Sequence, residues 1–207
     1  CGDSYLYRSI ALNGDFDDKT ILFSLQKHFD VLPEGFDAFS TSVGIREFFN
    51  ETIYDEDYFT EGGCTALINT NIEAMKINYA DGILTITEGP KVLIYRFNYG
   101  EEEPLDSLTS FYVQGGEAES LFSKGNYIIG GFNNENGCYM ALLDSDDLIS
   151  SNLTFASGYS INAISYDNTS QSLVLAAGSD GVVVYSWSGE TLDISLKGVL
   201  EVGSDNY

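Results

Sequence analysis

The sequence predicts an all-β chain of repeated four-stranded antiparallel units. Short apolar runs rich in β-branched residues recur along its 207 residues, separated by Gly, Asp, Ser and Asn, which favour turns. The run at 83–86 is matched at 127–130 and again at 173–176, so the pattern repeats at intervals of roughly 44 to 46 residues. A regular interval of this length indicates one structural unit used several times.

Each repeat contains four expected strands. The run that reveals the repeat is the second strand, and a third strand follows it at a spacing that suits a short hairpin. Weaker apolar runs precede and follow this pair. In chain order the expected strands are 73–79, 83–86, 92–95 and 107–113, then 117–123, 127–130, 138–142 and 151–157, then 161–167, 173–176, 182–185 and 193–200. Gly178-Ser179-Asp180-Gly181 is expected to be a tight turn, because Gly readily adopts a positive φ.

Four strands per repeat and this period are typical of a β-propeller, in which each blade buries an apolar face against the next. Leucine-rich repeats and right-handed β-helices have shorter periods and fewer strands per turn. We therefore expect propeller blades within residues 73–207, at about 73–116, 117–160 and 161–200. Known propellers have about four to eight blades. Either residues 1–72 supply further strands or the chain belongs to a larger propeller, with residues 201–207 leading into a further blade.

Residues 1–72 do not keep the repeat and are expected to form an extension with a tether and a divergent or partial blade. Residues 15–32 have apolar positions near helical spacing after an acidic start, but the same stretch is rich in β-forming residues. Helix and strand both remain open there. Residues 66–70 are expected to form a strand that leads into the first clear blade.

The chain is strongly acidic, with 32 Asp and Glu against 9 Lys and Arg and a formal net charge of −23. Such a surface repels phosphate, so nucleic acid is excluded as a partner and anionic membranes are disfavoured. No run approaches the roughly 18 apolar residues of a membrane-spanning helix. An acidic surface suits saline or calcium-containing surroundings, where counterions screen the self-repulsion.

The three cysteines carry two further expectations. Cys1 opens the chain and is followed by small polar residues, as in a bacterial lipoprotein after signal cleavage. We therefore expect a lipid anchor on Cys1 and an extracytoplasmic location at the cell envelope or surface; the alternative is an arbitrary boundary that falls on a cysteine. Cys64 and Cys138 can form a disulfide in an exported protein, although a buried free thiol suits Cys138 equally well.

Candidate sites for chemistry are sparse. His28 is the single histidine, which argues against His-rich metal sites and a Ser-His-Asp triad. Two acidic clusters offer oxygen ligands for Ca²⁺, although neither has the spacing of an EF-hand loop. They are Asp15, Asp17 and Asp18, and Asp144, Asp146 and Asp147. The glycine pairs at 115–116 and 130–131 are interpreted as turn residues, because no helix follows them to complete a phosphate cradle.

The third unit, "SLVLAAGSDGVVVYSWSGETLDISLKG", resembles the LVIVD, WD40-like and YVTN-like repeats of bacterial and archaeal surface propellers. Those repeats have a strand ending in Ala-Gly or Ala-Asp, a Gly-containing turn and a hydrophobic strand ending near Asp. Here Ser186-Trp187-Ser188 replaces the final Asp, and the second unit has the longer turn "GGFNNENGCY". The resemblance covers about residues 73–200 and implies an exported lipoprotein propeller that displays an interaction surface. It transfers no catalytic residue.

Two functions follow from these observations. The first is a non-enzymatic scaffold at the cell surface that binds other surface proteins or glycans, because a propeller is a rigid support for recognition loops and no convergent catalytic set is visible. The alternative is a calcium-dependent hydrolase or lyase whose central channel is lined by Glu73, Glu117 and Asn162.

Overall fold

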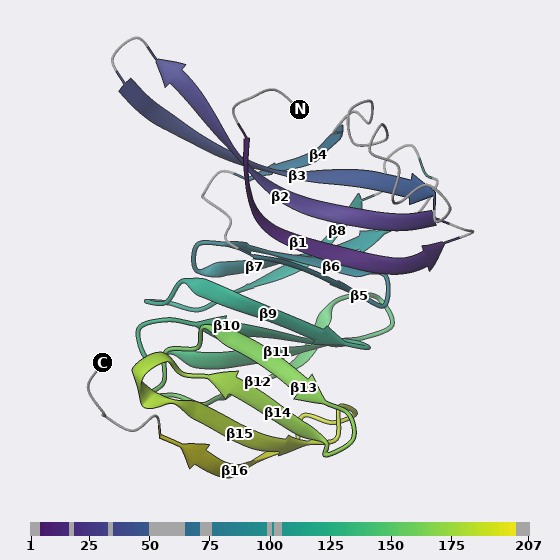
Figure 1. Cartoon of the computed structure of the whole chain (residues 1–207). Helices are drawn as coiled ribbons and strands as arrows, with labels where there is room; N and C mark the ends of the chain where they lie inside the picture. Colours follow the sequence, from purple (N-terminus) through teal and green to yellow (C-terminus); the bar gives the residue numbers. More distant parts are fainter. Residues whose placement is uncertain are drawn as a thin grey trace.

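The computed structural model describes residues 5–16, 19–32, 35–49, 65–70, 76–98, 101 and 105–201, and side chains from residue 76 onward. The chain forms four four-stranded antiparallel sheets, one after another along the sequence (Figure 1). The first sheet contains β1 (Tyr5–Phe16), β2 (Lys19–Leu32), β3 (Gly35–Phe49) and β4 (Thr65–Thr70). The second contains β5 (Ile77–Ala80), β6 (Ile83–Glu88), β7 (Lys91–Phe97) and β8 (Leu105–Tyr112).

The last two sheets have the same plan. The third contains β9 (Ala118–Lys124), β10 (Tyr127–Phe132), β11 (Gly137–Leu143) and β12 (Ile149–Phe155). The fourth contains β13 (Ala163–Asp167), β14 (Ser172–Ala176), β15 (Val182–Trp187) and β16 (Ile194–Leu200). In every sheet the strands pair in chain order, so each connection within a sheet is a hairpin. The expected all-β architecture of four-stranded antiparallel units is confirmed.

The first sheet is longer than its sequence pattern suggested. Its first three strands have 12, 14 and 15 residues, and the stretch at 19–32 is a strand, not a helix. The β2–β3 hairpin also extends past its neighbours, because β1 pairs only as far as His28 whereas β2 continues to Leu32 opposite Gly35 (Figure 1). A divergent or partial blade was expected here, and the backbone forms a complete four-stranded sheet.

The sheets pack face to face, with the first strand of each sheet beside the first strand of the next. β5 lies against β1, and β9 lies between β5 and β13. β10 is buried along its whole length, because the second sheet covers one of its faces and the fourth sheet covers the other. This burial on both faces explains why its sequence reads as a continuous apolar run.

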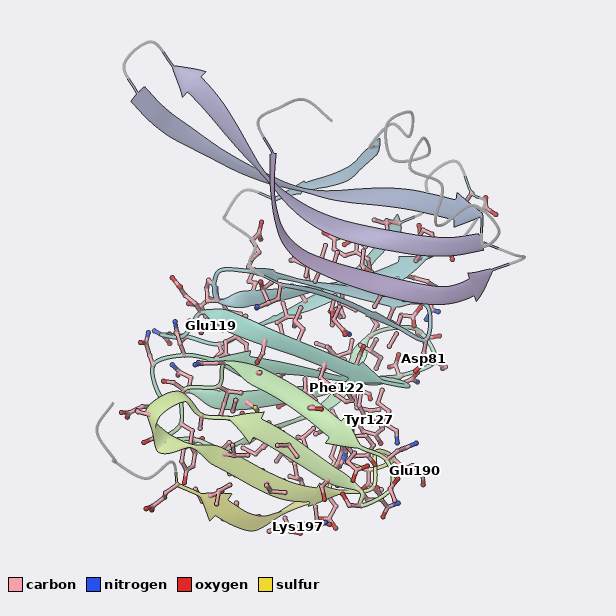
Figure 2. The ribbon with its side chains drawn as sticks, viewed as in Figure 1. Asp81, Glu119, Phe122, Tyr127, Glu190 and Lys197 are labelled. Carbon is pink, nitrogen blue, oxygen red and sulfur yellow. The ribbon has the colours of Figure 1, made fainter. Side chains whose placement is uncertain are left out.

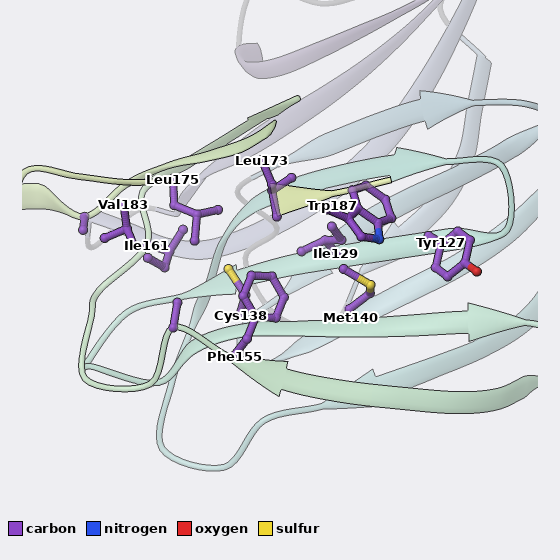
Figure 3. Packing of buried hydrophobic residues seen from close by; sticks show 12 residues of the cluster. Tyr127, Ile129, Cys138, Met140, Phe155, Ile161, Leu173, Leu175, Val183 and Trp187 are labelled. Carbon is purple, nitrogen blue, oxygen red and sulfur yellow. The ribbon is translucent and has the colours of Figure 1, made fainter. Parts of the chain in front are cut away.

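Two apolar cores fill the spaces between the sheets that have described side chains. The core between the second and third sheets includes Val92, Ile94, Phe111, Ile128 and Phe132. The core between the third and fourth sheets is larger and gathers around Trp187, which is 1% exposed (Figure 3). Its buried members also include Tyr127, Ile129, Cys138, Met140, Phe155, Ile161, Leu173, Leu175 and Val183. Trp187 therefore packs between the third and fourth sheets.

One glycine interpretation was wrong. Gly130 and Gly131 lie inside strand β10, not in a turn. A Cβ added at Gly131 would lie 2.2 Å from Ser120 Oγ and 2.7 Å from Ile161 Cγ2. Glycine is therefore required here by close packing between sheets. Gly178 and Gly181 behave as expected, with φ of 58° and 90° in the β14–β15 turn.

Candidate binding surface

The loops of the second to fourth sheets gather at two opposite ends of the strands. At one end lie the segments that precede β9 and β13 and the β10–β11 turn. We call the polar surface that they form the amide–carboxylate rim, defined by Glu117, Glu119, Asn133, Asn134, Glu135 and Asn162. Figure 2 labels Glu119 at this end, whereas Asp81 and Glu190 lie at the opposite end.

Asn133 is hydrogen-bonded to two of the rim's three glutamates, Glu117 and Glu119. Its side-chain oxygen accepts a hydrogen bond from the backbone N–H of Glu117 at 2.8 Å. Its side-chain nitrogen donates to a carboxylate oxygen of Glu119 at 2.9 Å. The β10–β11 turn is thereby tied to the start of β9, which leaves the rim pre-organised and not free to rearrange.

The β10–β11 turn is one exposed part of the rim. Asn134 and Glu135 both have a left-handed backbone, with φ of 53° and 61°. The side-chain amide of Asn134 donates to the carbonyl of Gly115 at 3.1 Å, and the backbone N–H of Glu135 donates to Ser160 Oγ at 3.0 Å. Asparagine adopts this conformation more readily than most residues, whereas glutamate depends on such tertiary contacts to hold it. The turn is a fixed, solvent-facing feature.

The chemistry of the rim suits a polar ligand without negative charge. Amides both donate and accept hydrogen bonds, and carboxylates accept them from hydroxyl, amide or cationic groups. A phosphate would meet several carboxylates here, and the chain as a whole repels it. The arrangement can therefore bind sugar hydroxyls or the amide and cationic groups of a protein.

At the opposite end of the strands, two carboxylates accept hydrogen bonds from backbone N–H groups of the turns. Asp81 accepts from the N–H of Gly125 at 2.8 Å, which links the second and third sheets. Asp167 accepts from Ser170 Oγ and from the N–H groups of Thr169 and Ser170. These hydrogen bonds, that of the Ser170 hydroxyl foremost, lower the pKa of Asp167 below its usual value. Both carboxylates serve the local structure.

The cluster Asp144, Asp146 and Asp147 lies in the β11–β12 turn. A carboxylate oxygen of Asp144 accepts from the N–H groups of Asp146 and Leu148, at 2.9 and 3.0 Å, and closes the turn. Asp147 forms an ion pair with Arg96. Across the described side chains no group of three or more His, Cys, Asp and Glu residues is placed to hold a metal ion. The side chains of the other cluster, Asp15, Asp17 and Asp18, lie outside the described residues, so calcium remains a prediction.

Of the other expected site residues, some lie within the described part of the chain and others lie outside it. Cys138 is a free thiol, fully buried, and burial raises its pKa above the usual value. Cys1, Cys64 and Glu73 lie outside the described residues, and only the backbone of His28, in β2, is described. The lipid anchor therefore stays a prediction, whereas for Cys138 the structure has the alternative, a buried free thiol, and not the disulfide with Cys64.

Two of the residues expected to line the channel, Glu117 and Asn162, occupy equivalent positions in the third and fourth sheets. Glu117 and Asn162 each directly precede a first strand, β9 and β13 respectively, and both are exposed. The sequence reasoning missed Glu119 and residues 133–135 of the rim. The signal was present in the long turn "NNENG", whose asparagines tolerate positive φ and cap backbone groups.

Comparison with known structures identifies the architecture. No protein-family model matches the sequence, and no curated protein sequence matches it. A structure of a protein from Lactobacillus plantarum superposes with a TM-score of 0.62 at 10% identity, covering 97% of this chain. A structure from Bacteroides uniformis ATCC 8492, described as a putative 6-phosphogluconolactonase, superposes with a TM-score of 0.65 at 9% identity over 94% of this chain.

The chain has the fold of a β-propeller. At these identities the likeness concerns the fold alone. The chain spans 57% of the length of each of the two structures. The four sheets are therefore propeller blades, the last three of which the sequence repeat predicted, and their inner strands are β1, β5, β9 and β13.

Proposed function

We propose that this propeller is a non-enzymatic binding module and that the amide–carboxylate rim is its recognition surface. The observation that carries the proposal is the β10–β11 turn, which presents exposed Asn134 and Glu135 in a backbone conformation fixed by hydrogen bonds. A pre-organised polar loop on a rigid support loses little entropy on binding.

The ligand is a glycan or another protein at the cell envelope. Amides and carboxylates match hydroxyl, amide and cationic groups, and the charge of −23 disfavours anionic ligands. The envelope location is a prediction that rests on Cys1, and intact-mass analysis of the native protein tests it by looking for a lipid on that residue.

The decisive experiment compares two variants with the same change of charge. Glu117→Gln with Glu135→Gln removes two exposed carboxylates from the rim, whereas Asp146→Asn with Glu190→Gln removes two exposed carboxylates from the opposite end. Binding is measured on a glycan array and, in parallel, against envelope proteins cross-linked to the chain in cells and then purified.

We expect the rim variant to lose about tenfold or more in affinity, equivalent to about 1.4 kcal/mol, and the matched variant to retain it. Equal losses would show that only the net charge matters. Retention by both variants would place recognition elsewhere. Envelope proteins and glycans are distinguished by which of the two assays responds.

A lactone hydrolase is the second candidate, because one of the similar structures is described as a putative 6-phosphogluconolactonase. The acidic surface argues against a phosphorylated substrate. Hydrolysis of 6-phosphogluconolactone by the purified protein, with and without added Ca²⁺, is compared with the spontaneous rate. A protein-dependent rate that the rim variant abolishes would replace the binding module with an enzyme.

A further inference from the structure

The β10–β11 turn ends on a chemically labile pair, Asn136 and Gly137. The sequence contains two such Asn–Gly pairs, at 13–14 and 136–137. Asparagine is among the thermolabile residues of proteins. When glycine follows it, no side chain shields the next backbone nitrogen, and the flexible backbone lets that nitrogen approach the asparagine side chain. The pair at 136–137 therefore holds the groups for a reaction within its own chain.

The turn depends on both members of the pair. Gly137 has a left-handed backbone, with φ of 70°, and a Cβ added there would overlap the carbonyl oxygen of Phe155. The side-chain nitrogen of Asn136 donates hydrogen bonds to the carbonyls of Asn133 at 2.9 Å and Asn134 at 3.1 Å. A larger residue at 137, or a side chain without donors at 136, would disturb the turn. The packing of the turn therefore keeps the labile pair in place.

The same contacts keep the two reacting groups apart. The nucleophile is the backbone nitrogen of Gly137, whose N–H donates to the carbonyl of Tyr159 at 2.9 Å. The group to be displaced is the side-chain amide nitrogen of Asn136, which is held by its two hydrogen bonds. Ser160 Oγ adds a further contact, because it accepts from the N–H of Glu135 at 3.0 Å. The β12–β13 connection, which carries Tyr159 and Ser160, must therefore detach from the turn before the pair can react.

We propose that Asn136 is a site of self-modification, which converts to aspartate or isoaspartate when the β12–β13 connection detaches from the β10–β11 turn. The lone pair of the Gly137 nitrogen forms a bond to Cγ of Asn136, and the bond from Cγ to the side-chain nitrogen breaks. That nitrogen leaves as ammonia with the proton of the Gly137 N–H, which closes a cyclic imide. Water then opens the imide at either of its carbonyls. The sum is the exchange of ammonia for water, so no oxidant or reductant is needed.

The product does not fit the turn that the asparagine closed. A carboxylate has no N–H to donate, so the carbonyls of Asn133 and Asn134 lose this donor and repel the new charge. The isoaspartate product also lengthens the backbone by a methylene directly before Gly137, whose close approach to Phe155 leaves no room for a shift. The modification is therefore a one-way change that opens the amide–carboxylate rim at its exposed turn.

Deamidation of the 207-residue protein, folded and unfolded in urea at the same mildly alkaline pH, tests the proposal. Peptide mass spectrometry distinguishes the acid from the amide, and electron-transfer fragmentation distinguishes isoaspartate from aspartate. We expect Asn136 to react at least about tenfold more slowly in the folded protein, because local opening must come first. Asn152, which precedes the bulky Leu153, is the slow-reacting reference in the unfolded chain. Equal rates in the folded and unfolded protein, or no reaction in the unfolded chain, would overturn the proposal.

Two serine variants test the role of the β12–β13 connection. Ser160→Ala removes the acceptor of the Glu135 N–H, whereas Ser150→Ala removes a hydrogen bond to the carbonyl of Leu142 at the opposite end of the strands. Ser160→Ala should speed deamidation in the folded protein about two- to tenfold, the factor expected from one lost hydrogen bond, and Ser150→Ala should not. Equal rates in the two variants would overturn the proposal, since the connection would then not control the reaction.

The effect on the rim is measured separately in Asn136→Asp, which has the aspartate product from the start. Amide hydrogen exchange at Glu135 and Gly137 should be faster in this variant than in the wild type, because the turn has lost two hydrogen bonds. Asn152→Asp makes the same change of charge away from the turn and should leave this exchange unchanged. Wild-type exchange in Asn136→Asp would show that the product fits the turn, and would overturn the one-way change.

Discussion

Arg96 near the end of β7 and Asp147 in the β11–β12 turn form an ion pair that links the second and third blades. The Nε of Arg96 donates to one carboxylate oxygen of Asp147 at 2.9 Å, and an Nη donates to the other. Both side chains are partly exposed, at 39% and 23%. The hydrogen bond to Asp147, more than any other interaction, raises the pKa of Arg96. Like the hydrogen bond from Gly125 to Asp81, the pair is a polar contact at the edge of the interface between these two blades.

We expect Arg96→Met to lower the free energy of unfolding by about 1 kcal/mol. Exposed ion pairs contribute little to stability, but the bidentate geometry places this pair near the upper end of their usual range. Arg96→Lys keeps the positive charge but cannot form the bidentate hydrogen bonds of the guanidinium group. It is therefore expected to be more stable than Arg96→Met but less stable than the wild type. Urea denaturation of Arg96→Met, Asp147→Asn and the double variant measures the coupling. A coupling of zero, or one that 1 M salt does not weaken, would contradict this account.

The repeat explains how much of the fold was visible in the sequence. Runs such as 83–86 and 127–130 are apolar because both faces of these strands are covered, and burial of that kind leaves a strong signal. The turn at 178–181 was visible because Gly178 and Gly181 need positive φ. Residues 19–32 were ambiguous because their apolar spacing suits a helix. The strand is decided by pairing with β3 along its whole length and with β1 as far as His28.

The amide–carboxylate rim was less visible in the sequence, for a physical reason. Glu119 and Asn133 come together through a hydrogen bond between β9 and the β10–β11 turn. That contact depends on the register of the third blade, which the sequence pattern does not specify. Gly130 and Gly131 were assigned to a turn because glycine usually marks one. Their real role, close approach between blades, is a tertiary constraint that leaves no local pattern.

Gly131 is expected to tolerate no side chain. A methyl group there would overlap Ser120 Oγ and the side chain of Ile161, so Gly131→Ala should lower the free energy of unfolding by about 1–3 kcal/mol. Gly198→Ala is the matched control, because Gly198 also lies in a strand and nothing stands within 4 Å of its added Cβ. Thermal unfolding of the two variants decides the matter. Equal Tm values would show that the third and fourth blades are not packed as closely as described.

Cys138 is expected to be unreactive in the folded protein. Its side chain is fully buried and burial raises the pKa of its thiol, so both access and the reactive thiolate are lacking. Raising the pH to 9 should not speed its alkylation, because the folded-state pKa lies above the ordinary value. Pulsed iodoacetamide labelling with peptide mass spectrometry measures this site separately from Cys1 and Cys64. Labelling of Cys138 at the same rate before and after denaturation would refute the prediction.

Trp187 is the single tryptophan and reports on the interface between the third and fourth blades. Its ring meets Tyr127 and Tyr166 edge to face, with centroids 5.5 and 5.3 Å apart, and its indole N–H donates to the carbonyl of Thr191 at 2.7 Å. We expect Trp187→Ala to cost about 3–5 kcal/mol, since it opens a cavity and leaves that carbonyl unpaired. Trp187→Phe retains the ring contacts and should cost less.

The fluorescence of Trp187 then distinguishes local from global unfolding. In the folded wild-type protein its emission should be blue-shifted and resistant to acrylamide quenching, because the ring is 1% exposed. If the fourth blade separates before the others, the emission shifts red at a lower urea concentration than the loss of β-structure followed by circular dichroism. Coincident transitions would show instead that the blades unfold as one cooperative unit. Emission typical of a solvent-exposed tryptophan in the absence of denaturant would contradict the interface itself.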